Sequence, residues 1–385
     1  DYFEAYSNLG VTLQELTRLE GAEVSFRQAI ALKPDYTEAQ LNLCELLEKM
    51  NRADELLSFI RSKSGKILEK KADYLYYEAL IEFREENHET AAELIEKINI
   101  NELLATRQPS AMKLQGDIYH QKKSYSDAFE SYKAKNKHVK DSLEYKKQKP
   151  EEYFVQQREK VIQIKQLQEQ SAYKSVIKAS WIQPTFLIGF PRSGTTLLDT
   201  ILRTHSNIDV LEEFPMVDKM NATLGENPTI SMIENMDNTA VEIASGFYLE
   251  ELKKHIVVGK NKVIIDKLPL NILELPLINQ IFPESSFILA LRHPMDSILS
   301  CVLTSFKINE AMANYENLET TANFYNEVFS LFNIYKKSFK LNYHAIKYEN
   351  VVNNFDFTIK NLLSFLNLKY ENALKNYYTT AKKRT

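Results

Sequence analysis

The sequence predicts a chain of two parts, a helical solenoid followed by an α/β domain with a mainly parallel sheet. The first half is rich in Leu, Ala, Glu, Lys and Tyr at helical spacing, and the whole chain has only nine glycines. After residue 182, short apolar segments alternate with helical patterns. The length of 385 residues also exceeds what one compact core usually holds.

Composition and charge exclude several classes of protein. Hydrophobic residues make up 44% of the chain and charged residues 26%, which predicts a globular fold with a sizeable core. A formal net charge of −4 argues against a domain-wide nucleic-acid surface, so we expect no nucleic-acid partner. No apolar run approaches the roughly 18 residues that a membrane-spanning helix needs.

The cysteines and histidines predict neither disulfides nor a metal site. Cys44 and Cys301 are too far apart for a zinc knuckle or a redox pair, which favours two free thiols in a reducing compartment. The seven histidines lack metal-binding spacing, so we expect no catalytic metal. The chain begins at Asp1 inside a helical pattern and ends at Thr385 without a stop signal. We therefore expect a fragment, and a cytoplasmic location that a lost N-terminal segment could change.

Residues 1–142 carry a repeating pattern. Its first copy consists of Tyr6, Leu9, Gly10, Leu13, Ala22, Phe26, Ala29 and Pro34. This spacing resembles the 34-residue tetratricopeptide repeat. Further copies are indicated by Leu43, Cys44 and Leu47, then by Ala79, Ala91 and Ile95, and then by Gly116, Tyr119, Ala128 and Tyr132. The resemblance implies a solenoid of three to four repeats. Its concave surface would hold a peptide or protein partner; alternatively, the solenoid only packs against the second half.

The next segment, 143–182, is predicted to be a helical connector with a polar helix over Glu151–Gln170. At Trp181–Pro184 the sequence changes from helical spacing to short apolar segments, so we place the second domain at 183–385. Its predicted strands are Thr185–Phe190, Ile208–Leu211, Lys262–Asp266, Ser286–Leu291 and Tyr343–Lys347. Helices are predicted over Gly194–Thr204, Pro294–Phe306, Thr321–Phe339 and Phe355–Leu366. This alternation predicts helices on both faces of the sheet and ligands at the carboxyl ends of its strands.

The segment Phe186–Leu198 has the features of a phosphate-binding loop. An apolar strand runs through a turn flanked by Gly189 and Gly194 directly into a helix, whose N-terminal N–H groups and dipole favour an anion. Arg192 adds a cation, and three hydroxyl side chains add donors. A nucleoside triphosphatase or kinase would need a lysine where Thr195 stands. Val263–Asp266 does resemble a Walker B strand, so a P-loop kinase remains the alternative.

Gly189–Leu197 also resembles the 5′-phosphosulfate loop of the sulfotransferases. Arg292 at a strand end and Ser300 eight residues later resemble the 3′-phosphate site of that family. The resemblance implies a P-loop-like sulfotransferase domain that uses 3′-phosphoadenosine 5′-phosphosulfate (PAPS) and releases 3′-phosphoadenosine 5′-phosphate (PAP), without a metal. The implied nucleotide-binding residues are Arg192, Ser193, Gly194, Thr195, Thr196, Leu197, Arg292 and Ser300.

Other segments resemble the tyrosylprotein sulfotransferases. The stretch from His205 to Phe214 implies Glu213 as the catalytic base, with His205 and His293 as alternatives. Asp266–Pro269 implies that Lys267 stabilises the transition state together with Arg192. Tyr348–Val351 resembles a structural segment.

The chain departs from the family pattern in three places. Ser206 and Asn350 replace a proline and an aspartate, and the C-terminal segment that contacts adenine looks truncated. The adenine-binding residues are therefore not assigned.

Together these patterns predict sulfation of a hydroxyl group, with a protein tyrosine as the leading acceptor. A glycan, a lipid or a small phenol is the alternative acceptor, and a non-catalytic repeat scaffold is the alternative of another class. The hypothesis depends on one geometric condition: Arg192 and Arg292 must open onto a single site.

Overall fold

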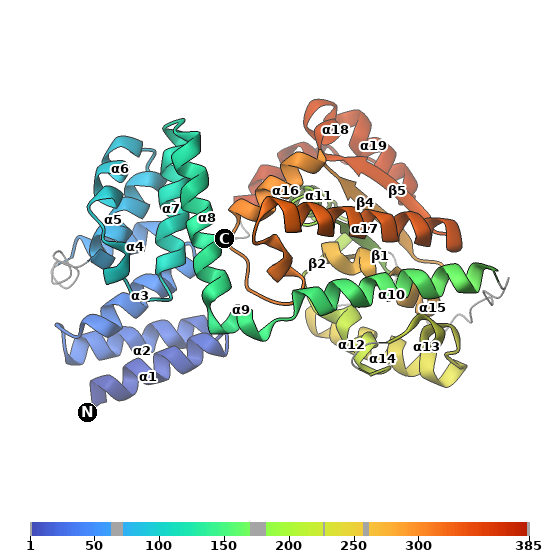
Figure 1. Cartoon of the computed structure of the whole chain (residues 1–385), viewed down its shortest axis with the longest axis horizontal. Coiled ribbons are helices and arrows are strands. Elements are labelled where there is room, and N and C mark those ends of the chain that lie inside the picture. Colours follow the sequence, from blue (N-terminus) through green and yellow to red (C-terminus); the bar gives the residue numbers. More distant parts are fainter. Residues whose placement is uncertain (1, 63–71, 170–181, 226–227, 257–261, 383–385) are drawn as a thin grey trace. The chain divides into compact units, whose positions relative to one another are not determined.

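The computed structural model describes residues 2–62, 72–169, 182–225, 228–256 and 262–382. These residues form two compact units, 1–142 and 143–384 (Figure 1). Within the described ranges, no helix combines the length and apolar character needed to cross a bilayer. Cys44 and Cys301 are both free and buried.

The first unit consists of helices that pack in consecutive pairs. Its helices are α1 (Tyr2–Glu15), α2 (Leu19–Leu32), α3 (Thr37–Lys49), α4 (Ala53–Ile60), α5 (Ala72–Arg84), α6 (His88–Glu96), η2 (Ile100–Glu102), α7 (Gln108–Gln121) and α8 (Tyr125–Asp141). Helix α1 packs on α2, α3 on α4, α5 on α6 and α7 on α8.

All four pairs turn in the same way. One residue with left-handed backbone lies in each turn: Thr17, Asn51, Glu86 and Lys123. The next residue donates its N–H to a carbonyl five positions back, as Arg18 does to Leu13 at 2.8 Å. The same bond forms at Arg52, Asn87 and Ser124. This is the Schellman helix ending. Its recurrence gives the unit a structural repeat, while its assignment to the tetratricopeptide family remains a prediction.

Small residues lie where the paired helices cross. A Cβ atom at Gly10 would come within 2.5 Å of the Phe26 ring, and one at Gly116 within 2.8 Å of the Tyr132 ring. The rings of Phe26 and Tyr132 are buried, so neither has room to move away. Close helix approach is therefore the physical reason for the spacing of small and aromatic residues.

The second unit contains a five-stranded sheet in which every pairing is parallel. The strands are β1 (Thr185–Gly189), β2 (Ile208–Glu212), β3 (Val263–Lys267), β4 (Ser286–Leu291) and β5 (Asn342–Lys347). Their order is β2-β3-β1-β4-β5. The predicted α + α/β architecture with a mainly parallel sheet is thereby confirmed.

The second unit also contains helices, several of which flank this sheet (Figure 1). They are α9 (Leu143–Lys147), α10 (Pro150–Glu169), α11 (Thr195–Leu202), α12 (Met216–Ala222), α13 (Ile230–Glu234), α14 (Asn238–His255), η3 (Pro269–Leu273), α15 (Leu275–Ile281), α16 (Pro294–Leu303), η4 (Met312–Tyr315), α17 (Leu318–Ser338), α18 (Tyr348–Asn353), α19 (Phe355–Phe365), η5 (Asn372–Asn376) and α20 (Tyr377–Lys382).

The central strand β1 is buried on both faces. Phe186 and Ile188 belong to a core cluster that includes residues of α14, α15 and α17. Leu187, which points to the opposite face, belongs to a second cluster with residues of α11 and α19. Burial on both faces explains why β1 reads as a continuous apolar run.

Helix α10 does not form a separate connector. The Phe154 and Phe324 rings lie 6.3 Å apart, Ile164 is buried in the core of the second unit, and Gln163 Oε1 accepts the Ile230 N–H at 2.8 Å. The polar composition of this helix conceals an apolar stripe that packs on α17. Part of the predicted domain boundary, including Trp181, lies outside the described residues.

Candidate active site

The loop after β1 presents the N-terminus of α11 at the carboxyl edge of the sheet. Gly194 precedes α11 with φ +94°, a conformation that glycine adopts without strain. A Cβ atom there would lie 2.7 Å from Cδ2 of Tyr348. At the other end of the loop, a Cβ at Gly189 would lie 2.6 Å from the carbonyl oxygen of Ala290. Both glycines are thus required by close packing around the loop.

The loop also holds an unsatisfied polar group. Ser193 is buried, and its Oγ has no hydrogen-bond partner among the described residues. A buried hydroxyl without a partner is costly unless a ligand or water completes its hydrogen bonding. Thr195 is buried as well, whereas Thr196 is exposed and Leu197 is half-buried. The loop therefore offers hydroxyl and N-terminal N–H groups to an anion.

The two arginines open onto one site. Nε of Arg192 donates to Oγ of Ser300 at 3.0 Å, and Nη1 of Arg292 donates to the carbonyl oxygen of Arg192 at 3.3 Å. Arg192 is exposed and has φ +65°, so its side chain leaves the loop from a backbone conformation uncommon for a non-glycine residue. The structure thus brings together three residues that lie up to 108 positions apart in the sequence.

Tyr348 and Glu349 support this arrangement. The guanidinium carbon of Arg292 lies 4.8 Å from the centroid of the Tyr348 ring, which also packs against Gly194. Oε1 of Glu349 accepts the backbone N–H of His293 at 2.8 Å, and this bond lowers the pKa of the Glu349 carboxyl. Tyr348 was predicted only as part of a structural segment. Its contact with Arg292 could not be inferred from sequence spacing.

Glu213 and Lys267 form a second group at the same edge. Lys267 is fully buried, and its Nζ donates to Oε1 of Glu213 at 2.7 Å and to Oε1 of Glu212 at 3.1 Å. Two carboxylates therefore compensate one buried ammonium group. The Glu213 side chain is 58% exposed and has room for another partner. Since Lys267 pairs in register with Leu187 of β1, this group lies beside the strand that carries the loop.

The two histidines differ in their surroundings. Nδ1 of His205 accepts the Asn207 N–H at 3.1 Å, and its Nε2 lies 2.9 Å from the carbonyl oxygen of Lys369. Both ring nitrogens are thus engaged in holding the chain, which argues against His205 as the base. His293 is exposed at the start of α16, where its backbone bonds Glu349.

Asp266, the aspartate of the Walker B-like strand, faces the core. It is fully buried, and its Oδ2 accepts from the Tyr248 hydroxyl at 3.0 Å. Burial raises the pKa of its carboxyl to about 7. It pairs in register with Phe186, whose side chain lies in the same core. This placement, together with Thr195 in the lysine position, argues against a magnesium-dependent kinase site.

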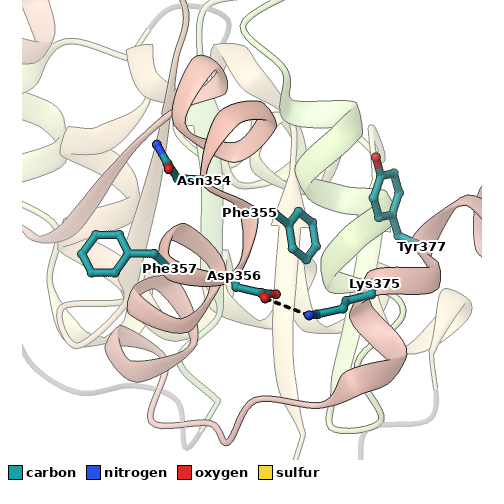
Figure 2. Close-up of a pocket in the computed structure, with 6 residues that line it drawn as sticks. All are labelled: Asn354, Phe355, Asp356, Phe357, Lys375 and Tyr377. Atoms are coloured by element: carbon teal, nitrogen blue, oxygen red, sulfur yellow. Dashed lines mark hydrogen bonds and ion pairs between the residues drawn. The ribbon is translucent and has the colours of Figure 1, made fainter.

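A separate hollow of about 590 Å³ lies beside α19 (Figure 2). Nζ of Lys375 contacts Oδ2 of Asp356 at 2.7 Å, and the rings of Phe355 and Tyr377 are stacked 5.8 Å apart. None of the predicted site residues lines this hollow. Its ion pair and stacked rings serve to pack the C-terminal helices.

The second unit thus combines a strand, a glycine-flanked loop and a helix, and two arginines converge on that loop. This arrangement is typical of P-loop-like α/β domains. Residues 184–372 match the family model described as "Sulfotransferase family". This domain belongs to the sulfotransferase family, a family of transferase enzymes.

Two curated proteins share part of this chain's sequence. An uncharacterised protein of Aquifex aeolicus (strain VF5) is 26% identical over 210 residues, which cover 52% of this chain and 27% of that protein. Nodulation protein NoeE of Sinorhizobium fredii (strain NBRC 101917 / NGR234) is 29% identical over 121 residues, which cover 28% of each chain. The matched region thus spans about a quarter of these relatives.

Solved structures that align with part of this chain include the sulfotransferase domain from the curacin biosynthetic pathway, with 19% identity and a TM-score of 0.36. That alignment covers 52% of this chain and 79% of the solved chain. Sulfotransferase STF9 from Mycobacterium avium has 11% identity and a TM-score of 0.33, with coverage of 76% and 86% respectively. Similarity at this level adds no independent support for a function.

Proposed function

We propose that the second unit transfers a sulfuryl group from PAPS to an acceptor hydroxyl. The observation that carries this proposal is the chain of contacts from Ser300 through Arg192 to Arg292. Because these contacts join the loop after β1 to the segment after β4, cations and hydroxyls from both segments face one site. A nucleotide with phosphate groups at both the 5′ and 3′ positions fits such a site.

The residues present fit this donor. The unpaired hydroxyl of Ser193 and the N-terminus of α11 would hold the 5′ end. Arg292 and Ser300, both of which contact Arg192, would hold the 3′-phosphate. PAPS supplies an activated sulfuryl group on a phosphate oxygen that leaves with the nucleotide. Arg192 would hydrogen-bond the charge that develops on oxygen during transfer.

Glu213 and Lys267 would serve the acceptor. An acceptor hydroxyl must lose its proton, and Glu213 offers an exposed carboxylate for that purpose. The bond from Lys267 fixes the orientation of that carboxylate and keeps a positive charge beside it. We assign Glu213 as the base and Lys267 as the residue that orients it and stabilises the transition state.

We propose a protein tyrosine as the acceptor. Support comes from the resemblance of the Glu213 and Lys267 segments to tyrosylprotein sulfotransferases. Support also comes from the repeated helix pairs of the first unit, an architecture that suits the binding of an extended peptide. Transfer from ³⁵S-labelled PAPS to a tyrosine peptide, a glycan, a lipid and a simple phenol would identify the acceptor. A preference for the phenol over the peptide would contradict this part of the proposal.

Nucleotide-dependent stabilisation tests the reaction class. PAP should raise the melting temperature of the full chain at low millimolar concentration, whereas ATP with magnesium should not. Stabilisation by ATP with magnesium alone would instead indicate the kinase. If PAP stabilises the chain but no acceptor is sulfated, the chain is a nucleotide-binding scaffold.

The cytoplasm is the proposed location, supported by two buried free thiols. Cell fractionation tests it, and recovery of the protein from an oxidising compartment would contradict it.

A further inference from the structure

A cavity of about 380 Å³ lies within the second unit and is distinct from the loop after β1. Side chains from α10 and α12 line it, together with residues from the segments after η3 and α16. The residues that matter for its chemistry are Gln157, Lys160, Asp218, Asn221, Glu274 and Glu310.

Two hydrogen-bond acceptors in this cavity lack donors. Gln157 is only 3% exposed, and its Oε1 has no partner among the described residues. Oδ1 of Asn221 is likewise buried without a partner in the described part of the chain. Nδ2 of Asn221 donates to Oε2 of Glu274 at 3.1 Å, which fixes the orientation of that amide. Buried acceptors of this kind call for a ligand that brings N–H or O–H donors.

The charge of the cavity favours a positive ligand. Asp218, Glu274 and Glu310 contribute carboxylates. Lys160 contributes one ammonium group, which already bonds Glu274 at 3.2 Å. Asp218 is exposed as a residue, but partial burial of its carboxyl, and then the nearby Glu274 charge, raises the pKa of that group. A bound cation would relieve this repulsion and stabilise the ionised carboxylate.

The size of the cavity indicates an organic cation rather than a metal ion. Its volume is many times that of a bare ion, and no group of three or more His, Cys, Asp or Glu side chains within the described ranges is placed to hold a metal. Amide oxygens and spaced carboxylates suit the N–H groups of an alkylammonium or guanidinium ion.

Two residues of the cavity follow closely in sequence after Glu213 and Lys267, the residues proposed to serve the acceptor. Asp218 is on α12, which begins at Met216, three residues after Glu213. Glu274 directly follows η3, which begins at Pro269, two residues after Lys267. Both residues therefore follow strand ends at the carboxyl edge of the parallel sheet, where ligands of such folds bind.

We propose that this cavity binds an alkylammonium or guanidinium group. The group could belong to a basic side chain of a polypeptide acceptor, or to a free diamine. The acceptor source rests on the sulfotransferase function proposed above, whereas binding of the cation itself does not.

Calorimetry on the full chain tests the binding. Cadaverine should bind the wild-type protein, while 1,5-pentanediol, which has the same chain length without charge, should not. Asp218→Asn and, independently, Gln157→Leu should each weaken cadaverine binding about tenfold. Glu319→Gln removes an exposed carboxylate elsewhere in the second unit and should leave binding unchanged. The proposal would be overturned if cadaverine did not bind, or if the diol bound equally well. It would also be overturned if equimolar magnesium displaced cadaverine, or if both cavity variants folded and bound cadaverine with unchanged affinity.

Acceptor kinetics identify the source of the cation. A tyrosine peptide with a neighbouring lysine is compared with the same peptide carrying norleucine. A KM at least fivefold lower for the lysine peptide, reversed by cadaverine and by Asp218→Asn, assigns the cavity to the acceptor. If the two peptides have equal KM values and calorimetry still detects cadaverine binding, the cavity is assigned to a free amine. If no peptide is sulfated, the sulfotransferase proposal fails, but calorimetry still decides on the cation.

Discussion

Substitution of Arg292 by methionine tests whether one nucleotide occupies both arginine sites. Methionine keeps much of the side-chain length but removes the charge and every donor. A hydrogen bond between charged groups contributes about 1.5–3 kcal/mol. Because the Arg292 side chain is 26% exposed, water screens part of this energy, and we take about 1.5–2 kcal/mol. PAP should therefore bind about 10- to 30-fold more weakly to Arg292→Met.

The assay compares two nucleotides on two proteins by calorimetry. AMP has the 5′-phosphate but no 3′-phosphate, so its affinity should change less than about twofold in the variant. Lys262→Met is the control, because Lys262 lies at the surface and bonds only Asp209 in the described structure, at 2.8 Å. An equal loss of affinity for PAP and AMP would refute the assignment of Arg292 to the 3′-phosphate. Thermal unfolding without ligand checks that losing the contact with Tyr348 leaves the fold intact.

Three further predictions concern the loop, the base and the core. Glu213→Gln should reduce ³⁵S transfer by about 10²–10⁴-fold while PAP affinity stays within twofold, and normal turnover would remove Glu213 from the mechanism. Gly194→Ala should lower the free energy of unfolding by about 1–3 kcal/mol and weaken PAP binding, because Gly194 has a positive φ and its Cβ would meet the Tyr348 ring. The control is Gly246→Ala, which should not lower the free energy of unfolding, because Gly246 lies in a helix and a Cβ there meets open space. For Asp266, burial raises the pKa in the folded protein to about 7, above the ordinary value of 3.8. The native state therefore holds an extra proton, and the free energy of unfolding falls as pH rises from about 4 to 7. Asp266→Asn should abolish this pH dependence of stability and raise the melting temperature at pH 8 but not at pH 4. An unchanged pH profile of stability would contradict this role of Asp266.

Much of the second unit could be predicted because its signals are local. Strands β1 and β4 are short apolar runs that are mostly buried, and the two glycines that flank the loop mark its ends in the sequence. The turn from Gly189 to Gly194 was therefore placed correctly on its strand and helix. In the first unit, the same holds for Gly10 and Gly116, whose spacing from an aromatic ring reflects a helix crossing.

The remaining features depend on contacts between distant segments. The sequence predicted Glu213 and Lys267 as separate site residues, but it could not show that Lys267 is fully buried and bonded to two carboxylates. It also left His205 as a possible base, because its bond partner Lys369 lies 164 residues away. Helix α10 was misjudged because its average polarity outweighed its few apolar residues, although those residues enter a core.

The register of one strand pair accounts for the proposed nucleotide site. Strands β1 and β4 are adjacent and parallel, with Gly189 opposite Ala290, so the loop after Gly189 and the segment after Leu291 leave the sheet side by side. Arg192 and Arg292 meet for this reason, although 100 residues separate them. A slip of β4 by two residues would keep the same faces buried but would move Arg292 by about 6.6 Å along the strand. That displacement exceeds the length of the hydrogen bond between Arg292 and Arg192. The strand pairing that completes the core therefore also brings together the residues of the proposed anion site.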